Sequence, residues 1–257
     1  MTSEKKRRLE MTVAAIRQQW GTRAIRRASK EAPATIPHIS TSFTGLDEAL
    51  GIGGIPRGRI TEIIGIPTSG MATTALKIIA NAQANDGTAV YLDLERTFDP
   101  DYAARCGVNV AQLLLVHPYN ERQALAILQD FALNGGVSAL VFDAPFHLLA
   151  RADLAQALST TLGRLVAPLD KAGCALLFLT ELRPGARASL ASYPNHLTLP
   201  HYATVRLFIR KERWLYKRED IQGYQADVQI VKNKLGPAGK LVPIAITFNG
   251  VVSGDKT

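Results

Sequence analysis

The sequence has little of what marks several classes of protein. Its two cysteines are Cys106 and Cys174, and the second lies in an apolar run. Such a residue is typically a small buried hydrophobe, so we expect no disulfide, no metal site and no redox chemistry. No apolar run is long enough to cross a bilayer, the first ten residues are strongly charged, and no internal repeat occurs. We therefore expect a cytoplasmic protein with no membrane contact.

What the chain does have is a globular composition with unevenly placed charge. Of 257 residues, 47% are hydrophobic and 20% are charged, which suits one large domain with a small extension. The net charge of +8 gathers at two segments: residues 1–32 carry nine Lys or Arg against three Asp or Glu, and residues 201–257 carry ten against five. This distribution predicts surfaces for a polyanion or an acidic partner, although charge alone fits solvated faces equally well.

The first 32 residues predict a basic helical extension. Residues 4–29 carry apolar side chains near helical spacing, and Gly21 interrupts that pattern. Residues 31–38 contain two prolines and small residues, which is typical of a linker. We expect a protomer- or partner-linking extension over 1–32 and a single α/β core over 33–257.

Strands and helices alternate along the core. The expected strands cover 59–65, 89–95, 138–145 and 174–182, and the expected helices cover 73–87, 121–135 and 151–171. This order predicts a mostly parallel sheet with helices on both faces and an active surface at the carboxyl ends of its strands. The segment 183–202 is long for a connection, which is typical of functional or disordered loops. Residues 203–214 and 226–234 alternate as an antiparallel pair does.

A glycine-bounded loop, residues 65–73 (GIPTSGMAT), joins a strand to a helix. The spacing of Gly65 and Gly70 is that of a Walker A phosphate-binding motif, in which a lysine and then Ser or Thr follow the second glycine. Met71 and Ala72 stand at those two positions. The lysine normally neutralises the β- and γ-phosphates and the hydroxyl ligates magnesium, and neither methionine nor alanine does this. Backbone N–H groups still attract an anion weakly, and such a turn is also a common structural feature.

Carboxylates follow the next two strands. Asp93 and Glu95 end one strand, where a carboxylate orients a water, and Asp143 ends the other, where a Walker B aspartate contacts magnesium. Each alone fits a solvated strand end. The three features in this order indicate a P-loop ATPase core.

With these motifs the sequence resembles the bacterial RecA recombinase family over nearly the whole chain. The likeness is carried by residues 38–65 (HISTSFTGLDEALGIGGIPRGRITEIIG), 92–108 (LDLERTFDPDYAARCGV), 228–237 (VQIVKNKLGP) and 15–29 (AIRQQWGTRAIRRAS). The resemblance implies a RecA-like α/β core with a mostly parallel central sheet flanked by helices, plus a small N-terminal helical extension. The segment 15–29 resembles the family's protomer-linking segment, which implies contact with a second copy or with a RecA-type recombinase.

The resemblance also implies roles for single residues. Glu95 falls on the residue that activates the attacking water, and Asp99 and Tyr102 fall on positions that contact the adenine. Lys232 and Lys234 match residues that reach across a filament interface toward the neighbour's γ-phosphate. The residues expected around a nucleotide are therefore Gly65, Ser69, Gly70, Met71, Ala72, Thr73, Asp99, Tyr102, Lys232 and Lys234.

The departures from the family concern catalysis and its link to DNA. Glu181 stands where the family has a glutamine that senses the γ-phosphate. The insertion that forms the first DNA loop is missing after Asp143, the Thr/Gly-rich centre of the second is missing from 183–202, and the tyrosine expected near the base is not obvious in 248–254. We also expect no counterpart of the family's separate C-terminal domain. We therefore expect Glu95 and Asp143 to be vestigial, ATP binding to be weak or lost, and magnesium binding to be lost.

Three functions compete on this basis. The first is a non-hydrolysing RecA-like protein that acts in DNA recombination or repair by binding single-stranded DNA or a recombinase filament. Its expected DNA contacts are Arg183, Arg187, Tyr193, His196, Arg206, Arg210, Lys211 and Arg213. The second is a protein-interaction accessory, for example to a translesion polymerase or as a recombinase modulator, without direct DNA binding. The third is an active DNA-dependent ATPase that uses Lys77 or a neighbour's lysine, which the position of Lys77 well along the helix disfavours.

Overall fold

The computed structural model describes residues 3–22, 24–25, 35–144, 151–182, 190–194, 196–249 and 252–253. Contacts along the chain divide it into two units, Met1–Thr35 and Ile36–Thr257. The first unit contains helix α1 (Ser3–Trp20), which has no buried residue and ends where Gly21 takes a positive φ of 87°. Among the residues that the structure describes, no helix is both long enough and apolar enough to span a membrane.

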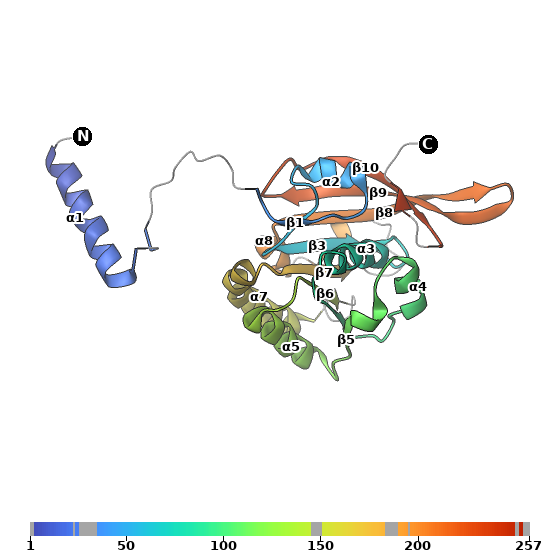
Figure 1. Ribbon diagram of the computed structural model, residues 1–257, viewed down its shortest axis with the longest axis horizontal. Helices are drawn as coiled ribbons and strands as arrows, with labels where there is room; N and C mark the ends of the chain where they lie inside the picture. The colour runs from blue at the N-terminus through green and yellow to red at the C-terminus, as the bar shows by residue number, and fades with distance from the viewer. Residues whose placement is uncertain are drawn as a thin grey trace. The chain divides into compact units, whose positions relative to one another are not determined.

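A nine-stranded sheet runs through the second unit (Figure 1), in the order β11-β10-β9-β8-β3-β7-β6-β4-β5. The parallel strands are β3 (Ile60–Gly65), β4 (Ala89–Asp93), β5 (Leu114–Val116), β6 (Ala139–Ala144), β7 (Ala175–Glu181) and β8 (Val205–Lys217). Three antiparallel strands extend the sheet beyond β8: β9 (Asp220–Asn233), β10 (Leu241–Thr247) and β11 (Val252–Ser253). A separate pair consists of β1 (His38–Ile39) and β2 (Ile55–Pro56). The predicted mostly parallel sheet is confirmed.

Helices cover both faces of this sheet because its central strands are apolar on both faces. Along β7, Leu177 and Leu179 belong to one hydrophobic cluster, whereas Leu176 and Phe178 belong to another. The first cluster includes residues of α2 (Thr44–Leu50), α3 (Met71–Gln83) and α4 (Pro100–Arg105), and the second those of α5 (Glu121–Asn134), α7 (Ala152–Ala172) and α8 (Leu199–Tyr202). Two short 3-10 helices are η1 (Val110–Gln112) and η2 (Leu190–Ser192).

Local side chains set where the elements begin and end. Asp99 precedes α4 and accepts a 2.9 Å hydrogen bond from the backbone N–H of Tyr102, as an N-cap does. The strand predicted over 89–95 ends early, at Asp93, because the Asp93 carboxylate accepts the backbone N–H groups of Thr97 and Phe98 and so turns the chain. Glu95 consequently lies in an exposed turn beyond the strand rather than at its end.

The hairpin of β8 and β9 is longer than the predicted antiparallel pair. Its register runs from Val205 opposite Asn233 to Lys217 opposite Asp220. Irregularities occur between Arg206 and Leu207, between Lys211 and Arg213, and between Leu215 and Tyr216. The parallel contact of β8 with β3 stops at Ile209, so the outer half of the hairpin projects beyond the body of the sheet (Figure 1).

Candidate functional site

Two glycines shape the loop that joins β3 to α3. Gly65 is the last residue of β3, and a Cβ there would lie 2.3 Å from the Ser69 Oγ. Gly70 precedes α3 with a φ of 109°, and a Cβ there would lie 2.7 Å from the Ile246 Cδ1. A larger residue at either position would clash with the folded loop. The Ser69 side chain is buried, and its hydroxyl has no hydrogen-bond partner within the described part of the chain.

The first turn of α3 offers backbone donors but no cation. Its N–H groups have no partner within the helix and carry the positive end of the helix dipole. Met71 is half-buried and packs against the hydrophobic core, and Ala72 is exposed. The buried Ser69 hydroxyl and the helix terminus fit a small anion, whereas Met71 and Ala72 do not fit the triphosphate and magnesium of a hydrolytic site.

Two tyrosine hydroxyls lie close to Thr73, the third residue of α3. The Thr73 hydroxyl lies 2.8 Å from the Tyr102 hydroxyl, so the structure brings these two predicted nucleotide residues together. Tyr224 of β9 adds a second phenol, because a Cβ on Gly70 would lie 3.3 Å from its oxygen. Burial raises the pKa of Tyr224 to about 12, so the phenol is neutral at physiological pH. The sequence analysis did not identify Tyr224, because the spacing of neighbouring residues does not show that β9 lies close to the loop 65–73.

Carboxylates gather at the neighbouring strand ends. The Tyr91 hydroxyl donates a 2.7 Å hydrogen bond to Asp143, which pairs across the sheet with Asp93. Burial, together with the charges of Asp93, Glu181 and Glu95, raises the pKa of Asp143 to about 6, against the opposing effect of the Tyr91 hydrogen bond. Four acids therefore influence one another at the edge of the sheet where the phosphate loop lies, since Glu181 is opposite Gly65 in the register of β7 and β3.

The metal prediction can be compared only with what the structure describes. Over the described ranges, no group of three or more His, Cys, Asp or Glu side chains has an arrangement that could hold a metal ion. The expected loss of magnesium binding stays a prediction. So do the vestigial roles of Glu95 and Asp143.

Replacing Asp143 with asparagine is expected to stabilise the protein at pH 8 by roughly 1–2 kcal/mol. Because the pKa of Asp143 is raised when folded, this residue favours folding fully below about pH 4, and that contribution is lost as the pH rises through about 6. Asparagine keeps an acceptor for Tyr91 without the charge. Urea unfolding at pH 4 and pH 8 measures the difference, which should shrink at pH 4. An asparagine variant less stable than wild type at pH 8 would contradict the assignment.

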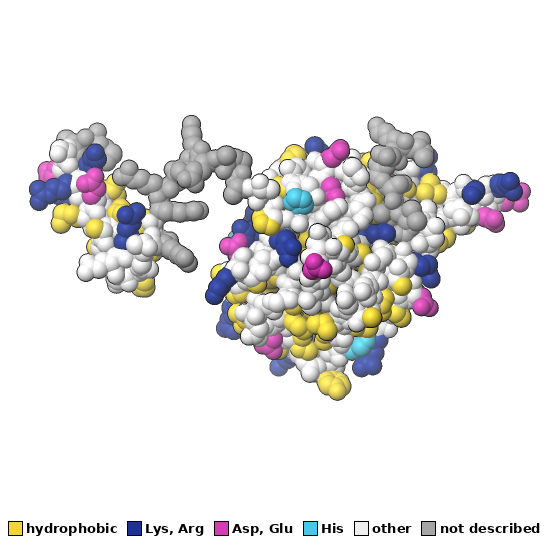
Figure 2. Space-filling model, viewed as in Figure 1, with side chains coloured by type: hydrophobic (Ala, Val, Ile, Leu, Met, Phe, Trp, Pro, Cys, Tyr) yellow, Lys and Arg dark blue, Asp and Glu magenta, His cyan; other side chains and the backbone are white. Residues whose placement is uncertain are grey.

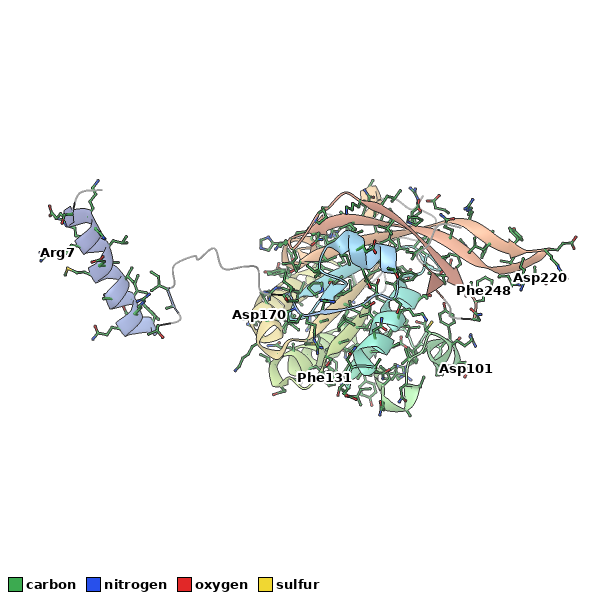
Figure 3. All side chains as sticks on the ribbon, turned by 45° about the horizontal axis from the view of Figure 1, so that its top comes forward. Arg7, Asp101, Phe131, Asp170, Asp220 and Phe248 are labelled. Carbon is green, nitrogen blue, oxygen red and sulfur yellow. The ribbon has the colours of Figure 1, made fainter. Side chains whose placement is uncertain are left out.

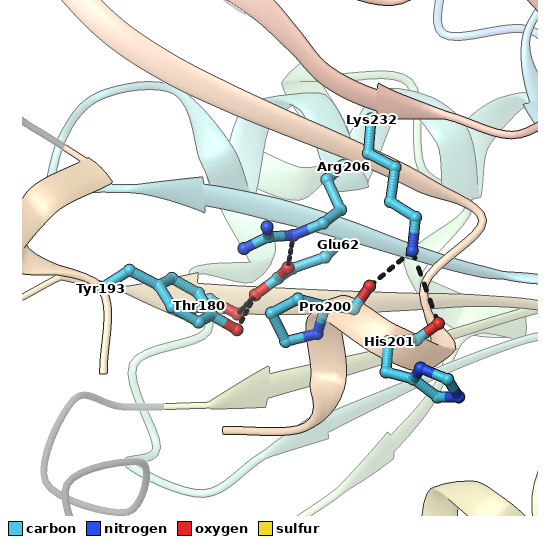
Figure 4. Close-up of polar contacts among 7 residues, drawn as sticks. All are labelled: Glu62, Thr180, Tyr193, Pro200, His201, Arg206 and Lys232. Carbon is cyan, nitrogen blue, oxygen red and sulfur yellow. Dashed lines mark hydrogen bonds and ion pairs between the residues drawn. The ribbon is translucent and has the colours of Figure 1, made fainter. Parts of the chain in front are cut away.

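Two predicted DNA contacts, Tyr193 and Arg206, are instead held inside the domain by Glu62 (Figure 4). Glu62 lies in the middle of β3 with none of its surface exposed. One of its carboxylate oxygens accepts hydrogen bonds from the Thr180 hydroxyl at 2.8 Å and the Tyr193 hydroxyl at 2.7 Å, and the other accepts the Arg206 Nε at 2.5 Å. The Arg206 guanidinium also lies 4.7 Å from the centre of the Tyr193 ring.

This network corrects the sequence interpretation. A buried carboxylate needs a cation and hydrogen-bond donors, and here Arg206, Tyr193 and Thr180 supply them. Burial and the Glu62 charge raise the pKa of Tyr193, so its phenol stays protonated and continues to donate. We therefore do not retain Tyr193 and Arg206 as DNA contacts.

Lys232 and Lys234 contact α8 of the same chain. The Lys232 Nζ donates to the carbonyl oxygen of Pro200 at 2.5 Å and to that of His201 at 3.4 Å, and the Lys234 Nζ lies 3.4 Å from the same His201 oxygen (Figure 4 shows the contacts of Lys232). Burial lowers the pKa of Lys232, with the charges of Lys234 and Arg206 acting in the same direction. Their role across a filament interface stays a prediction.

The other predicted DNA residues lie at the surface or outside the described residues. Arg210, Lys211 and Arg213 lie on the outer half of β8, with Arg210 and Arg213 exposed and Lys211 half-buried, and His196 is exposed after η2. Figure 2 shows Lys and Arg side chains, with Asp and Glu beside them, on the projecting hairpin. Arg183 and Arg187 fall outside the described residues.

Comparisons with known proteins agree with this fold. Residues 7–253 match the family model described as the RecA N-terminal domain. Protein RecA of Chloroherpeton thalassium is 35% identical over 266 residues, which cover 97% of this chain and 74% of that protein. Protein RecA of Clostridium novyi is 33% identical over 268 residues, covering 98% and 77%. The crystal structure of the RadB recombinase superposes with a TM-score of 0.68 at 21% identity over 85% of this chain and 100% of that chain, which supports the fold alone.

Proposed function

The chain belongs to the RecA family, which indicates a role in DNA recombination or repair, and we propose that it fills this role by binding single-stranded DNA without hydrolysing ATP. The observation that carries the proposal is the start of α3, where Met71 and Ala72 replace a cation and a magnesium-binding hydroxyl. The acids grouped with Asp143 add negative charge at the same edge of the sheet. A triphosphate brought there would meet repulsion without a compensating lysine.

An ATPase that uses Lys77 fits this geometry poorly. Lys77 lies six residues beyond Met71 in α3, which corresponds to about 9 Å along the helix axis. The positive charge of Lys77 lowers the pKa of the Cys106 thiol, which follows α4, whereas burial raises that pKa. Lys77 therefore lies along the helix toward α4 rather than over the loop.

The expected DNA contacts are cations that have no buried partner. Arg210 donates to the exposed Glu212 and lies opposite Asp227 in the hairpin, and Arg213 donates to Gln225 at the surface. Such side chains can exchange their partners for phosphate at little cost, because exposed ion pairs contribute at most about 1 kcal/mol. Both side chains lie on the part of β8 that continues beyond its parallel contact with β3.

Binding of a fluorescent oligothymidylate is expected to weaken steeply as salt rises from 50 to 200 mM. About four phosphate contacts would give a loss of roughly 50-fold over that range, because bound counterions are released on binding. Fluorescence anisotropy measures this. Substituting Arg210→Ala together with Arg213→Ala should reduce the salt slope, whereas Arg164→Ala, an exposed arginine of α7, should leave it unchanged.

Absence of binding even at 50 mM salt would overturn the DNA proposal and favour the accessory function. One observation supports that second function. Helix α1 carries Leu9, Met11 and Trp20 with 54%, 63% and 70% of their surface exposed, although such side chains usually gain stability from burial. A second copy or a recombinase is the partner that the family suggests for this helix.

A further inference from the structure

The projecting half of the β8–β9 hairpin exposes several large apolar side chains. Trp214, Tyr216 and Ile221 of the hairpin have 42%, 62% and 44% of their surface exposed, and Phe248, which follows β10, has 49%. Figure 3 shows Asp220 at the tip of the hairpin and Phe248 near its base. Aromatic residues are costly to leave in water and are enriched where proteins bind partners. This hairpin therefore has the character of an interaction surface.

The rings share one face of the hairpin. Trp214 lies opposite Tyr224 and Tyr216 lies opposite Ile221, and residues two apart on a strand point to the same side. The ring centres of Trp214 and Tyr224 are 6.2 Å apart, and those of Trp214 and Phe248 are 6.3 Å apart, both in edge-to-face arrangements. We call the exposed rings Trp214, Tyr216 and Phe248 the aromatic platform, whereas Tyr224 is buried in the core behind Trp214.

A cation, the Lys211 ammonium, lies over the Trp214 ring of the platform. The Lys211 Nζ is 3.9 Å from the centre of the Trp214 ring and 5.7 Å from that of Tyr224. The stretch 210–218 has five Lys or Arg against Glu212 as its single acid, but Arg210 and Arg213 lie opposite Asp227 and Gln225, which alternate with Tyr224 and so point to the other face of the hairpin. The acids Glu219 and Asp220 lie at the turn, beyond the platform. A ligand on the platform would therefore meet flat apolar rings and positive charge within a few ångströms of each other.

We propose that the aromatic platform stacks unpaired bases of single-stranded DNA, with Lys211 beside the phosphate backbone. This inference rests on the proposed DNA-binding function and assigns to it a mode of binding. Bases stack on protein aromatic rings whatever their sequence, and cations follow the backbone beside them. Bases in a duplex already stack on one another, so the platform favours single strands over duplex. A docked acidic peptide would use the cations but not the rings.

The chain offers a direct optical test. It has two tryptophans, Trp20 and Trp214, so a Trp20→Phe background leaves Trp214 as the only one. Titrating that variant with oligothymidylate at 50 mM salt is expected to quench the emission of Trp214 in a saturable way. A duplex of the same length should quench it far less.

Removing rings should weaken binding without changing the number of phosphate contacts. Trp214→Ala and Tyr216→Ala are each expected to lower the affinity for oligothymidylate on the order of 5- to 100-fold, at an unchanged salt slope. Lys211→Ala should instead reduce the slope. Tyr119→Ala is the matched control, because Tyr119 is an 86% exposed tyrosine between β5 and α5, and its affinity should equal that of wild type. Trp214→Phe should retain most of the affinity, which separates stacking from misfolding.

The outcomes separate this inference from the function on which it rests. If wild type binds no oligothymidylate at 50 mM salt, both fall. If it binds with a salt-dependent affinity that Trp214→Ala and Tyr216→Ala leave unchanged, the platform is wrong and the DNA-binding function stands. Equal quenching by oligoglutamate, or by duplex, would also overturn the stacking mode.

Discussion

Replacing Arg206 with alanine is expected to lower the free energy of unfolding by about 3–5 kcal/mol, because it leaves a buried carboxylate without its cation. Glu62 has no exposed surface, and the remaining donors, Thr180 and Tyr193, are neutral hydroxyls. Domains of this size are typically stable by only about 5–15 kcal/mol, so this one side chain accounts for a large share. Urea unfolding followed by circular dichroism measures the loss.

Two further variants test whether the charge is the cause. Arg210→Ala removes an arginine from the same strand whose partner, Glu212, is exposed, so the loss should stay below about 1 kcal/mol. Adding Glu62→Gln to Arg206→Ala should recover part of the stability, because glutamine still accepts from both hydroxyls without a buried charge. If Arg206→Ala cost no more than Arg210→Ala, the network would not be a major source of stability.

Restoring the phosphate loop is expected to increase ATP affinity by roughly 10- to 100-fold. The combined change Met71→Lys with Ala72→Thr returns the lysine and the hydroxyl, and one charge-assisted hydrogen bond contributes about 1.5–3 kcal/mol. The buried Ser69 hydroxyl and the free first turn of α3 already suit an anion. Isothermal titration calorimetry with ATP and magnesium measures the gain over wild type.

The controls separate the loop from general charge. Asn85→Lys adds the same charge just past the far end of α3 and should give no gain. Ala72→Thr alone should give little, since it adds no cation. A double variant that binds ATP no better than wild type would mean that the pocket has changed beyond its two missing side chains. If Glu181→Gln then restored binding, the acids around Asp143 would be the physical cause.

The sheet and its helices followed from local patterns. The apolar run at 59–65 and the helical spacing of apolar residues at 121–135 are patterns that extend over a few neighbouring residues. Strands and helices that alternate along the chain favour parallel strands joined by helices. The phosphate loop was also placed correctly, because Gly65 and Gly70 mark the strand end and the helix start. These features depend on neighbours in the sequence, and local spacing reports them.

The internal role of Tyr193 and Arg206 did not follow from local patterns. Their shared partner Glu62 lies 131 and 144 residues away, within an otherwise apolar strand. On sequence alone, a basic residue and a tyrosine near a long loop fit DNA contacts as well as they fit partners of a buried carboxylate. The internal role becomes evident only from the pairing of β3 with β8, which places Glu62 opposite Arg206.

The aromatic platform could not be predicted from the sequence for a different reason. Lys211 and Trp214 are three residues apart, so simple alternation places them on opposite faces of a strand. The irregularity between Lys211 and Arg213 inserts one residue and returns both side chains to the same face, opposite Ala226 and Tyr224. A β-bulge of this kind cannot be located from alternation, because it is an exception to it.

The central position of β3 also constrains the order in which the chain can fold. Both strands that flank it, β7 and β8, are synthesised much later, and Glu62 precedes Thr180 by 118 residues and Arg206 by 144. At ribosomal speeds of about 5–20 residues per second, that interval lasts roughly 7–30 seconds. During that interval β3 lacks both neighbouring strands, and the Glu62 carboxylate stays hydrated. A chain that ends before Arg206 lacks the cation that pairs with Glu62 in the folded protein.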